Sequence, residues 1–350
     1  MRIAQVAPLI EAVPPKSYGG TERVVSWITE ELVRCGHDVT LFASGDSQTT
    51  AELVPCSSQA LRFDPDAIVA EPYHAVMLDR VWKRKDDFDV IHFHIDYMHF
   101  PLFNSIAQKT LTTLHGRLDL PFLVPAFRHF DTMPLVSISM HQRRPMPYAR
   151  WVGKVHHGLP ADMLPYCEAP SWDYLAFLGR ICPEKRVDRA IRIAKRVGMK
   201  LKIAAKVDKA DIKYFKTEIE PLLDDPLVEF IGEVNDVEKR DFLGNAYATL
   251  FPIDWPEPFG LVMIESMACG VPVIAWPHGS VPEVIENGLT GFIVEDEDAA
   301  VNAVRRARML NRRFIRQRFE ERFSVERMTD DYVSLYEQAV GRKRSSALSA

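Results

Sequence analysis

The first half of the chain alternates short apolar runs, rich in β-branched residues, with longer segments of helical period. Residues 21–36 show the helical pattern most clearly, because apolar side chains such as Val24 and Ile28 recur on one face and Gly36 follows the last turn. The short runs predict strands at residues 2–7, 38–43, 89–94, 110–116, 134–139 and 153–160. Strands that alternate with helices predict a parallel sheet with helices on its faces.

The same alternation starts again at Tyr174. Predicted strands here occupy residues 174–180, 201–205, 228–233, 248–252 and 272–276, and predicted helices occupy residues 184–198, 237–246 and 260–270. A chain of 350 residues is too long for one ordinary domain. We therefore expect two Rossmann-like α/β domains, residues 1–158 and 159–325, with the boundary in the polar, proline-containing stretch 159–172 and a closing helix over residues 326–343.

Composition narrows the class of protein. Hydrophobic residues make up 47% and charged residues 26% of the chain, which is typical of a globular protein. The 43 basic and 48 acidic residues give a net charge of -5, which argues against a nucleic-acid-binding protein. The five cysteines include no CxxC pair, and we find neither a signal peptide nor an apolar run of about 18 residues, so we expect a cytoplasmic protein. Peripheral membrane contact and the oligomeric state stay open.

Ligands of doubly wound sheets bind beyond the carboxyl ends of the strands, so the residues that follow each strand are the candidates for function. Gly19 and Gly20, in SYGGTERVV, follow the first strand and precede the first helix. Paired glycines let a phosphate or an acceptor approach the backbone at a helix N-terminus. The alternative is an ordinary turn in which Thr21 caps the helix. The pattern is not GxGxxG, which argues against an NAD-dependent oxidoreductase.

Two cations follow the first strand of the second half. Arg180 and Lys185 lie in FLGRICPEKRVDRAI, where the strand gives way to a helix. Fixed positive charges beside a helix N-terminus would bind a diphosphate and stabilise the negative charge that develops as it leaves. The alternative is a solvated basic helix face, which explains Arg186, Arg189 and Arg192 better than it explains the first two.

Two glutamates lie beside a Pro-Phe-Gly turn in DWPEPFGLVMIESMACG. The backbone N–H groups of Phe259, Gly260 and Leu261 could bind phosphate, whereas carboxylates suit the hydroxyl groups of a sugar. We therefore expect Glu257 to hold sugar hydroxyls and Glu265 to reach a ribose diol. The alternative is an acid that stabilises the helix dipole together with an exposed helix residue. A carboxylate among apolar neighbours, however, requires a ligand or a buried partner.

The segment EPFGLVMIE, in which seven residues separate Glu257 from Glu265, resembles the E-x7-E element of the retaining glycosyltransferases of family 4, which have the GT-B fold. The segments YGGTERVV, LGRICPEKRVDRAI, ACGVPVIAW and GSVPEVIENGLTGFIVE resemble the same family at the corresponding places. The resemblance covers nearly the whole chain. It implies two Rossmann-like domains whose parallel sheets face an interdomain cleft, and a final helix that crosses back onto the first domain.

The resemblance also implies roles for single residues. In that family the second glutamate binds the ribose of a nucleotide sugar and the first contacts the donor sugar, which corresponds to Glu265 and Glu257 here. The residues at the places of Arg180 and Lys185 bind the diphosphate, and a histidine at the place of His115 contacts the sugar near the reacting carbon. A histidine at a strand end could instead cap a loop. The family is generally metal-independent, which implies no metal and no cofactor besides the nucleotide-sugar co-substrate.

Some features depart from this pattern. Ala205 and Lys206 stand where the family usually has a glycine, which would alter the wall near the diphosphate, and His157 stands where an asparagine is common. The segment HFHIDYMHF also contains residue types that bind metals, namely His92, His94, Asp96 and His99. We interpret these histidines as polar lining of the acceptor cleft instead of a metal site.

The sequence therefore predicts a metal-independent enzyme that moves a hexosyl unit from a nucleoside diphosphate sugar, of the UDP-sugar or GDP-mannose type, to a sugar, lipid or small-molecule acceptor. The anomeric configuration is expected to be retained. Two alternatives stay open. One is a phosphorylase or epimerase with the GT-B fold, and the other is a non-catalytic nucleotide-sugar-binding protein.

Overall fold

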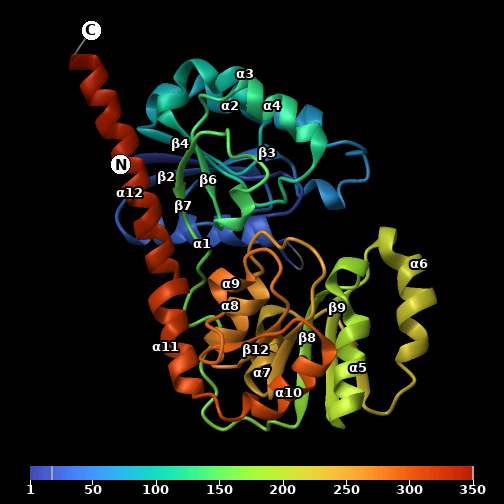
Figure 1. Ribbon diagram of the computed structural model, residues 1–350. Helices are drawn as coiled ribbons and strands as arrows, with labels where there is room; N and C mark the ends of the chain where they lie inside the picture. Colours follow the sequence, from blue (N-terminus) through green and yellow to red (C-terminus); the bar gives the residue numbers. More distant parts are fainter. Residues whose placement is uncertain (17–18, 349–350) are drawn as a thin grey trace. The chain divides into compact units, whose positions relative to one another are not determined.

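The computed structural model describes the backbone of residues 1–16 and 19–348 and the side chains of this range up to residue 341. Ser17 and Tyr18 of the SYGGTERVV motif lie outside the described residues. Contacts between Cα atoms divide the chain into two compact units (Figure 1). The N-terminal unit contains residues 1–158 and the segment that begins at Val325, and the C-terminal unit contains Leu159–Ser324.

The N-terminal unit is built on a seven-stranded parallel sheet with the strand order β3-β2-β1-β4-β5-β6-β7. Its strands are β1 (Arg2–Val6), β2 (Asp38–Ser44), β3 (Glu52–Ser57), β4 (Val90–Phe93), β5 (Thr110–Thr113), β6 (Leu135–Ser137) and β7 (Trp151–Lys154). Its helices are α1 (Gly20–Arg34), α2 (Glu71–Lys83), α3 (Phe100–Phe103), α4 (Val124–His129) and α12 (Val325–Leu348). Every residue of β4 and β5 is buried, as expected for central strands of a parallel sheet.

Two helices from opposite ends of the chain pack together on this unit. Helix α12 contacts both α1 and β4. The aromatic rings of Tyr332 and Tyr336 are fully buried, and the ring centroid of Tyr332 lies 4.9 Å from that of His92 in β4. The last helix of the sequence therefore belongs to the core of the N-terminal unit.

The C-terminal unit is built on a six-stranded parallel sheet with the order β10-β9-β8-β11-β12-β13. Its strands are β8 (Tyr174–Arg180), β9 (Lys200–Lys206), β10 (Val228–Gly232), β11 (Ala248–Phe251), β12 (Val273–Ala275) and β13 (Gly291–Ile293). Its helices are α5 (Val187–Val197), α6 (Ile212–Tyr214), α7 (Asp236–Gly244), α8 (Leu261–Ala268), α9 (Val281–Val284), α10 (Glu297–Ala307) and α11 (Arg312–Phe323). Helix α8 packs on β11 and β12, and α7 and α11 pack on α8.

The fold class predicted from the sequence, two Rossmann-like units with parallel sheets, is confirmed. Some boundaries differ from the prediction. The last strand of the N-terminal sheet is residues 151–154, not 153–160, because Gly158 and Pro160 follow in a segment that leaves the sheet. The closing helix runs to Leu348 instead of residue 343, since no proline interrupts it and Gly341 does not end it. Among the described residues, no helix is both long enough and apolar enough to span a lipid bilayer.

Candidate active site

Two of the predicted donor residues, Lys185 and Glu257, lie where the strand order of the C-terminal sheet reverses. Strands β8 and β11 are adjacent and parallel, although two other strands of the sheet, β9 and β10, separate them along the chain. From β8 the chain leads to β9 on one side, and from β11 it leads to β12 on the other. Such a point leaves a crevice at the carboxyl ends of the strands, where ligands of doubly wound sheets bind. Lys185 follows β8 and Glu257 follows β11, so the two loops at this point carry both residues.

The two loops are joined by a charged hydrogen bond. The Nζ atom of Lys185 donates to Oε2 of Glu257, and the indole Nε1 of Trp255 donates to the same oxygen over 3.1 Å. Lys185 also lies 5.0 Å from the ring centroid of Trp255 and 5.6 Å from that of Phe251. The Glu257 residue is buried, with 8% of its surface exposed. From the sequence we expected Lys185 and Glu257 to be separate ligands of the donor. In the structure each is the partner of the other.

Arg180, the last residue of β8, faces a different set of acids. Its guanidinium nitrogens lie 3.5 Å from Asp208 and 3.6 Å from Asp211, which follow β9. In the sheet, Arg180 is the register neighbour of Lys206, and Nζ of Lys206 lies 3.0 Å from Asp208. Lys206, the departure noted in the sequence, therefore adds a cation next to Arg180. The two aspartates were not predicted; the signal for them was their position directly after a strand.

The turn that carries Glu257 is fixed by the loop that follows β12. Ser280 donates from its amide to the carbonyl of Glu257 over 2.9 Å and from its hydroxyl to the carbonyl of Phe259 over 2.6 Å. A Cβ atom added to Gly279 would lie 2.1 Å from the carbonyl oxygen of Glu257, so only glycine permits this approach. Gly260 precedes α8 with a positive φ of 79°, and α8 begins at Leu261, one residue later than predicted.

Glu265 has a buried partner that the sequence did not identify. Nζ of Lys239, in α7, lies 2.6 Å from Oε1 of Glu265. Both residues are buried, with exposed fractions of 8% and 4%. The signal for Lys239 was present in the pattern, since it lies at helical spacing from Phe242 and Leu243 on the buried face of α7. Of the two outcomes expected for Glu265, a ligand or a partner, the structure contains the partner.

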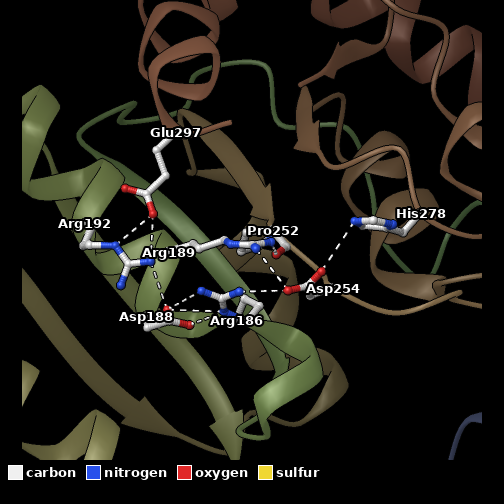
Figure 2. Close-up of polar contacts among 8 residues, drawn as sticks. All are labelled: Arg186, Asp188, Arg189, Arg192, Pro252, Asp254, His278 and Glu297. Carbon is white, nitrogen blue, oxygen red and sulfur yellow. Dashed lines mark hydrogen bonds and ion pairs between the residues drawn. The ribbon is translucent and has the colours of Figure 1, made fainter. Parts of the chain in front are cut away.

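A network of arginines and carboxylates connects the two loops to each other (Figure 2). Oδ2 of Asp254 accepts hydrogen bonds from Arg186 over 2.9 Å and from Arg189 over 3.0 Å, and Nε2 of His278 lies 3.7 Å from Oδ1. The amide of Asp254 donates to the carbonyl of Glu184 over 2.8 Å. Asp254 therefore ties the loop after β11 to the loop after β8. From the sequence we expected Arg186 and Arg189 to lie on a solvated helix face. In the structure both donate hydrogen bonds to Asp254.

The network continues along α5. Asp188 accepts hydrogen bonds from Arg186 and, over 3.0 Å, from Arg192, which also donates to Glu297 of α10 over 2.8 Å (Figure 2). A cavity of about 630 Å³ lies beside these residues. The predicted donor residues Arg180, Lys185, Glu257 and Glu265 do not line it.

The remaining predicted residues belong to the N-terminal unit. Helix α1 begins at Gly20, and Gly19 precedes it, so Thr21 lies inside the helix and does not cap it. A Cβ atom added to Gly19 would lie 2.8 Å from Cβ of Pro15, which shows how closely the loop after β1 folds on itself. The two glycines thus make a tight entry to α1, and the approach of a phosphate or an acceptor to them stays a prediction.

His115 follows β5 and lies among other histidines. Its Nε2 shares a hydrogen bond of 2.9 Å with Nδ1 of His94, and its ring stacks on that of His157 with centroids 5.2 Å apart. The Nδ1 atom of His115 is buried, and no hydrogen-bond partner for it is present among the described residues. Burial lowers the pKa of His115 to about 3, so the imidazole is neutral at ordinary pH.

The histidines of HFHIDYMHF, which we expected to line an acceptor cleft, are buried within the N-terminal unit. His92 is fully buried and bonds to Tyr336 over 2.7 Å and to Thr113 over 2.8 Å. His99 is also buried and bonds to Thr112 over 2.9 Å. Polar partners inside the sheet and under α12 hold these rings, because a buried imidazole requires hydrogen bonds. In the part of the chain that the structure describes, no group of three His, Cys, Asp or Glu side chains is arranged to hold a metal ion.

Comparison with known proteins decides the family. A family model described as Glycosyltransferase Family 4 matches residues 18–159, and one described as Glycosyl transferases group 1 matches residues 171–323. Together the two models cover most of both units. The chain is a family 4 glycosyltransferase.

Named relatives of the glycosyltransferase transfer sugars. Phosphatidyl-myo-inositol mannosyltransferase of Mycolicibacterium smegmatis is 24% identical over 337 residues, which cover 85% of this chain and 82% of that protein. D-inositol 3-phosphate glycosyltransferase of Saccharomonospora viridis is 27% identical over 239 residues, covering 62% of this chain and 53% of that protein. The glycosyltransferase is accordingly an enzyme.

Solved structures show the same fold. Sucrose-phosphate synthase from Thermosynechococcus elongatus superposes with a TM-score of 0.79 at 17% identity, covering 98% of this chain and all (100%) of that one. HepE of Anabaena, solved in complex with UDP and glucose, superposes with a TM-score of 0.74 at 15% identity, covering 97% of this chain and 100% of that one. At these identities the likeness concerns the fold, which is of the GT-B type.

Proposed function

We propose that the glycosyltransferase moves a hexosyl unit from a nucleoside diphosphate sugar to a hydroxyl-bearing acceptor with retention of the anomeric configuration and without a metal ion. The observation that carries the proposal is the contact between Lys185 and Glu257 at the switch point of the C-terminal sheet, directly before α8. A diphosphate needs a cation and a helix N-terminus, and a sugar needs an acceptor of hydroxyl hydrogen bonds. One crevice offers all of these.

The roles divide between charge and hydroxyl recognition. Lys185, Arg180 and the backbone N–H groups of Phe259, Gly260 and Leu261 stabilise the diphosphate as it departs. Because these groups supply positive charge directly, the reaction does not require a divalent cation.

The carboxylates and the glycine loop complete the proposed site. Glu257 and His115 orient the sugar, and Glu265 accepts hydrogen bonds from the ribose. Gly19 and Gly20 leave room for the donor and the acceptor beside the backbone. His115 suits contact with a neutral sugar, because the low pKa of its largely buried imidazole keeps it uncharged.

The structures of the Anabaena relative support a nucleotide-sugar donor, since that protein was solved with UDP, with UDP and glucose, and with UDP-glucose. The mannosyl- and glycosyltransferase names of the curated relatives leave both UDP-sugars and GDP-mannose as candidates. Those names also recommend inositol-containing lipids and inositol phosphates as the first acceptors to test.

A two-stage experiment tests the proposal. A thermal-shift screen against UDP-glucose, UDP-galactose, UDP-N-acetylglucosamine and GDP-mannose identifies the donor, because a ligand that binds only the folded protein raises its Tm. Release of nucleoside diphosphate is then measured with each acceptor, with and without EDTA, and NMR of the product gives the anomeric configuration. We expect acceptor-dependent release that EDTA leaves unchanged. Donor binding without release for any acceptor would contradict the proposal, and so would an inverted product.

A further inference from the structure

The ion pair between Lys239 and Glu265 has no part in the residue roles proposed above. Glu265 is the charged residue of α8, whose other residues are Leu, Val, Met, Ile, Ser and Ala. Nζ of Lys239 lies 2.6 Å from its Oε1 atom, within an environment that excludes most water from both side chains. A buried ion pair bears a desolvation cost that a surface pair does not, so its presence here calls for a structural or a functional explanation.

The lysine reaches this position from a helix whose start is well fixed. Asn235 caps α7 with a capping box, in which its side chain accepts from the amides of Val237 and Glu238 while the Glu238 side chain accepts from the amide of Asn235. Lys239 lies in the next turn, and its Nζ is 3.5 Å from the partly exposed Asp236 as well as close to Glu265. The ammonium is therefore held between α7 and α8 by its stem and by two carboxylates.

Stability alone does not account for this pair. The cost of removing two charges from water often equals or exceeds the attraction between them, so apolar side chains of similar volume would stabilise the contact of α7 and α8 at least as well. What the pair does provide is orientation. The ammonium holds one carboxylate oxygen, Oε1, and no other side chain in the described part of the structure donates a hydrogen bond to Glu265. The other oxygen, Oε2, stays available to accept hydroxyl hydrogen bonds.

We propose that Lys239 is a positioning residue for the nucleotide: by holding the carboxylate of Glu265 in one orientation, it gives the enzyme its selectivity for a donor that carries ribose hydroxyls. This inference rests on the proposed role of Glu265 in binding the ribose. Because the ribose is remote from the reacting carbon, Lys239 affects the binding of the donor in the ground state and the transition state equally. Its loss raises the KM of the donor and leaves kcat nearly unchanged.

The test compares nucleotides with and without the ribose hydroxyls. Isothermal titration calorimetry measures the affinity of the wild-type enzyme and of Lys239→Met for UDP, GDP and ADP, and for the 2′,3′-dideoxy form of whichever diphosphate binds. Lys195→Met is the matched control, since Lys195 forms a pair of 3.0 Å with Asp225 on the surface of the same unit. Lys239→Gln, which keeps a neutral hydrogen-bond donor, serves as a second variant if the Met variant does not fold.

The expected result is a selective loss. The wild type binds the ribose form at least about tenfold more tightly than the dideoxy form, as is usual when hydrogen bonds to a charged group are removed. Lys239→Met binds the ribose form about tenfold more weakly than the wild type and the dideoxy form equally well, Lys239→Gln gives an intermediate loss, and Lys195→Met matches the wild type.

Other outcomes overturn the inference in distinguishable ways. If Lys239→Met keeps the wild-type preference for ribose, or weakens both forms equally, Lys239 has only a structural role and the proposed function stands. If the wild type binds a diphosphate but does not distinguish the two forms, the role of Glu265 is wrong and the inference fails with it. If the wild type binds none of the diphosphates, the proposed function itself is overturned.

Discussion

Lys185 and Glu257, which are 72 positions apart in the sequence, are hydrogen-bonded to each other where the strand order of the C-terminal sheet reverses. Each is therefore compensated in charge before any ligand binds. A diphosphate that enters the crevice offers Lys185 a stronger partner, since charge-assisted bonds to phosphate are among the strongest that a lysine makes. Glu257 then keeps the hydrogen bond from Trp255 to Oε2, and Lys185 no longer competes with a sugar hydroxyl for that oxygen. In the proposed function, this exchange of partners would link diphosphate binding to sugar binding.

The first prediction concerns Lys185. Lys185→Ala removes a fixed charge from the leaving diphosphate, and we expect kcat to fall about 100-fold, the usual effect of losing one donor to a developing charge. Steady-state assays of nucleoside diphosphate release give this value. Lys195→Ala removes a surface lysine of the same unit and should retain wild-type kcat. A Lys185→Ala enzyme with wild-type kcat would show that the departing phosphate is stabilised elsewhere.

The second prediction concerns Asp254, which ties the loop of Lys185 to the loop of Glu257 (Figure 2). Asp254→Ala removes the carboxylate that Arg186 and Arg189 share, although Arg186 keeps Asp188 as a partner. The link between the two loops is weakened, and we expect kcat to fall about tenfold because small misplacements of positioning groups are costly. The free energy of unfolding should change by less than about 1 kcal/mol, since the pairs are partly exposed.

Glu297→Gln provides the comparison for Asp254. Glu297 belongs to the same charged network through Arg192, but it lies in α10 and joins neither of the two loops. The glutamine variant should keep wild-type kcat. If both variants reduce kcat equally, the effect comes from the charge of the network and not from the alignment of the loops.

The fold could be predicted because its signals are local. The alternation of short apolar runs and helical segments depends on side chains a few positions apart, and it predicted both sheets. β3 was missed because Glu52–Ser57 contains a proline and is only partly buried at the edge of its sheet. The strand β13 (Gly291–Ile293) was also missed; it has only three residues and lies at the edge of its sheet.

The candidate site could be predicted in part for the same reason. Glu265 stood out because a carboxylate in an apolar helix is anomalous within its own segment. Its partner Lys239 did not, because the contact depends on how α7 packs against α8, and no local pattern specifies which residues of two helices meet. The aspartates that bind Arg180 were missed likewise, since they follow a neighbouring strand of the sheet.

The third prediction uses two glycines with similar backbone conformations. Gly279 and Gly288 have positive φ values of 60° and 79°, but an added Cβ would meet the backbone of Glu257 at Gly279 and no atom within 4 Å at Gly288. Gly288→Ala should cost only the backbone strain, about 1 kcal/mol of unfolding free energy. Gly279→Ala should cost at least about 3 kcal/mol or displace Glu257 and abolish activity. Equal effects in urea unfolding and in activity would show that the loop near Glu257 has room to move.

The last prediction concerns stability at acid pH. Burial lowers the pKa of His115 to about 3, and burial also lowers the pKa values of His92, His94 and His157 well below the ordinary value. The unfolded chain binds protons at these residues near pH 6.5, whereas the folded N-terminal unit does not. Folding is therefore most favoured above about pH 6.5, and stability decreases as the pH falls toward 3.

Urea unfolding monitored by tryptophan fluorescence at about pH 7.5 and about pH 5.5 measures this loss. His115 alone contributes about 1 kcal/mol to it, because a group with an unfolded pKa near 6.5 and a folded pKa near 3 is protonated almost only in the unfolded chain at the lower pH. His115→Gln should therefore lose about 1 kcal/mol less than the wild type between the two conditions. His129→Gln replaces an exposed histidine of α4 and should behave as the wild type does. If His115→Gln shows the full wild-type loss, the imidazole accepts a proton in the folded protein, and a neutral His115 beside the sugar is untenable.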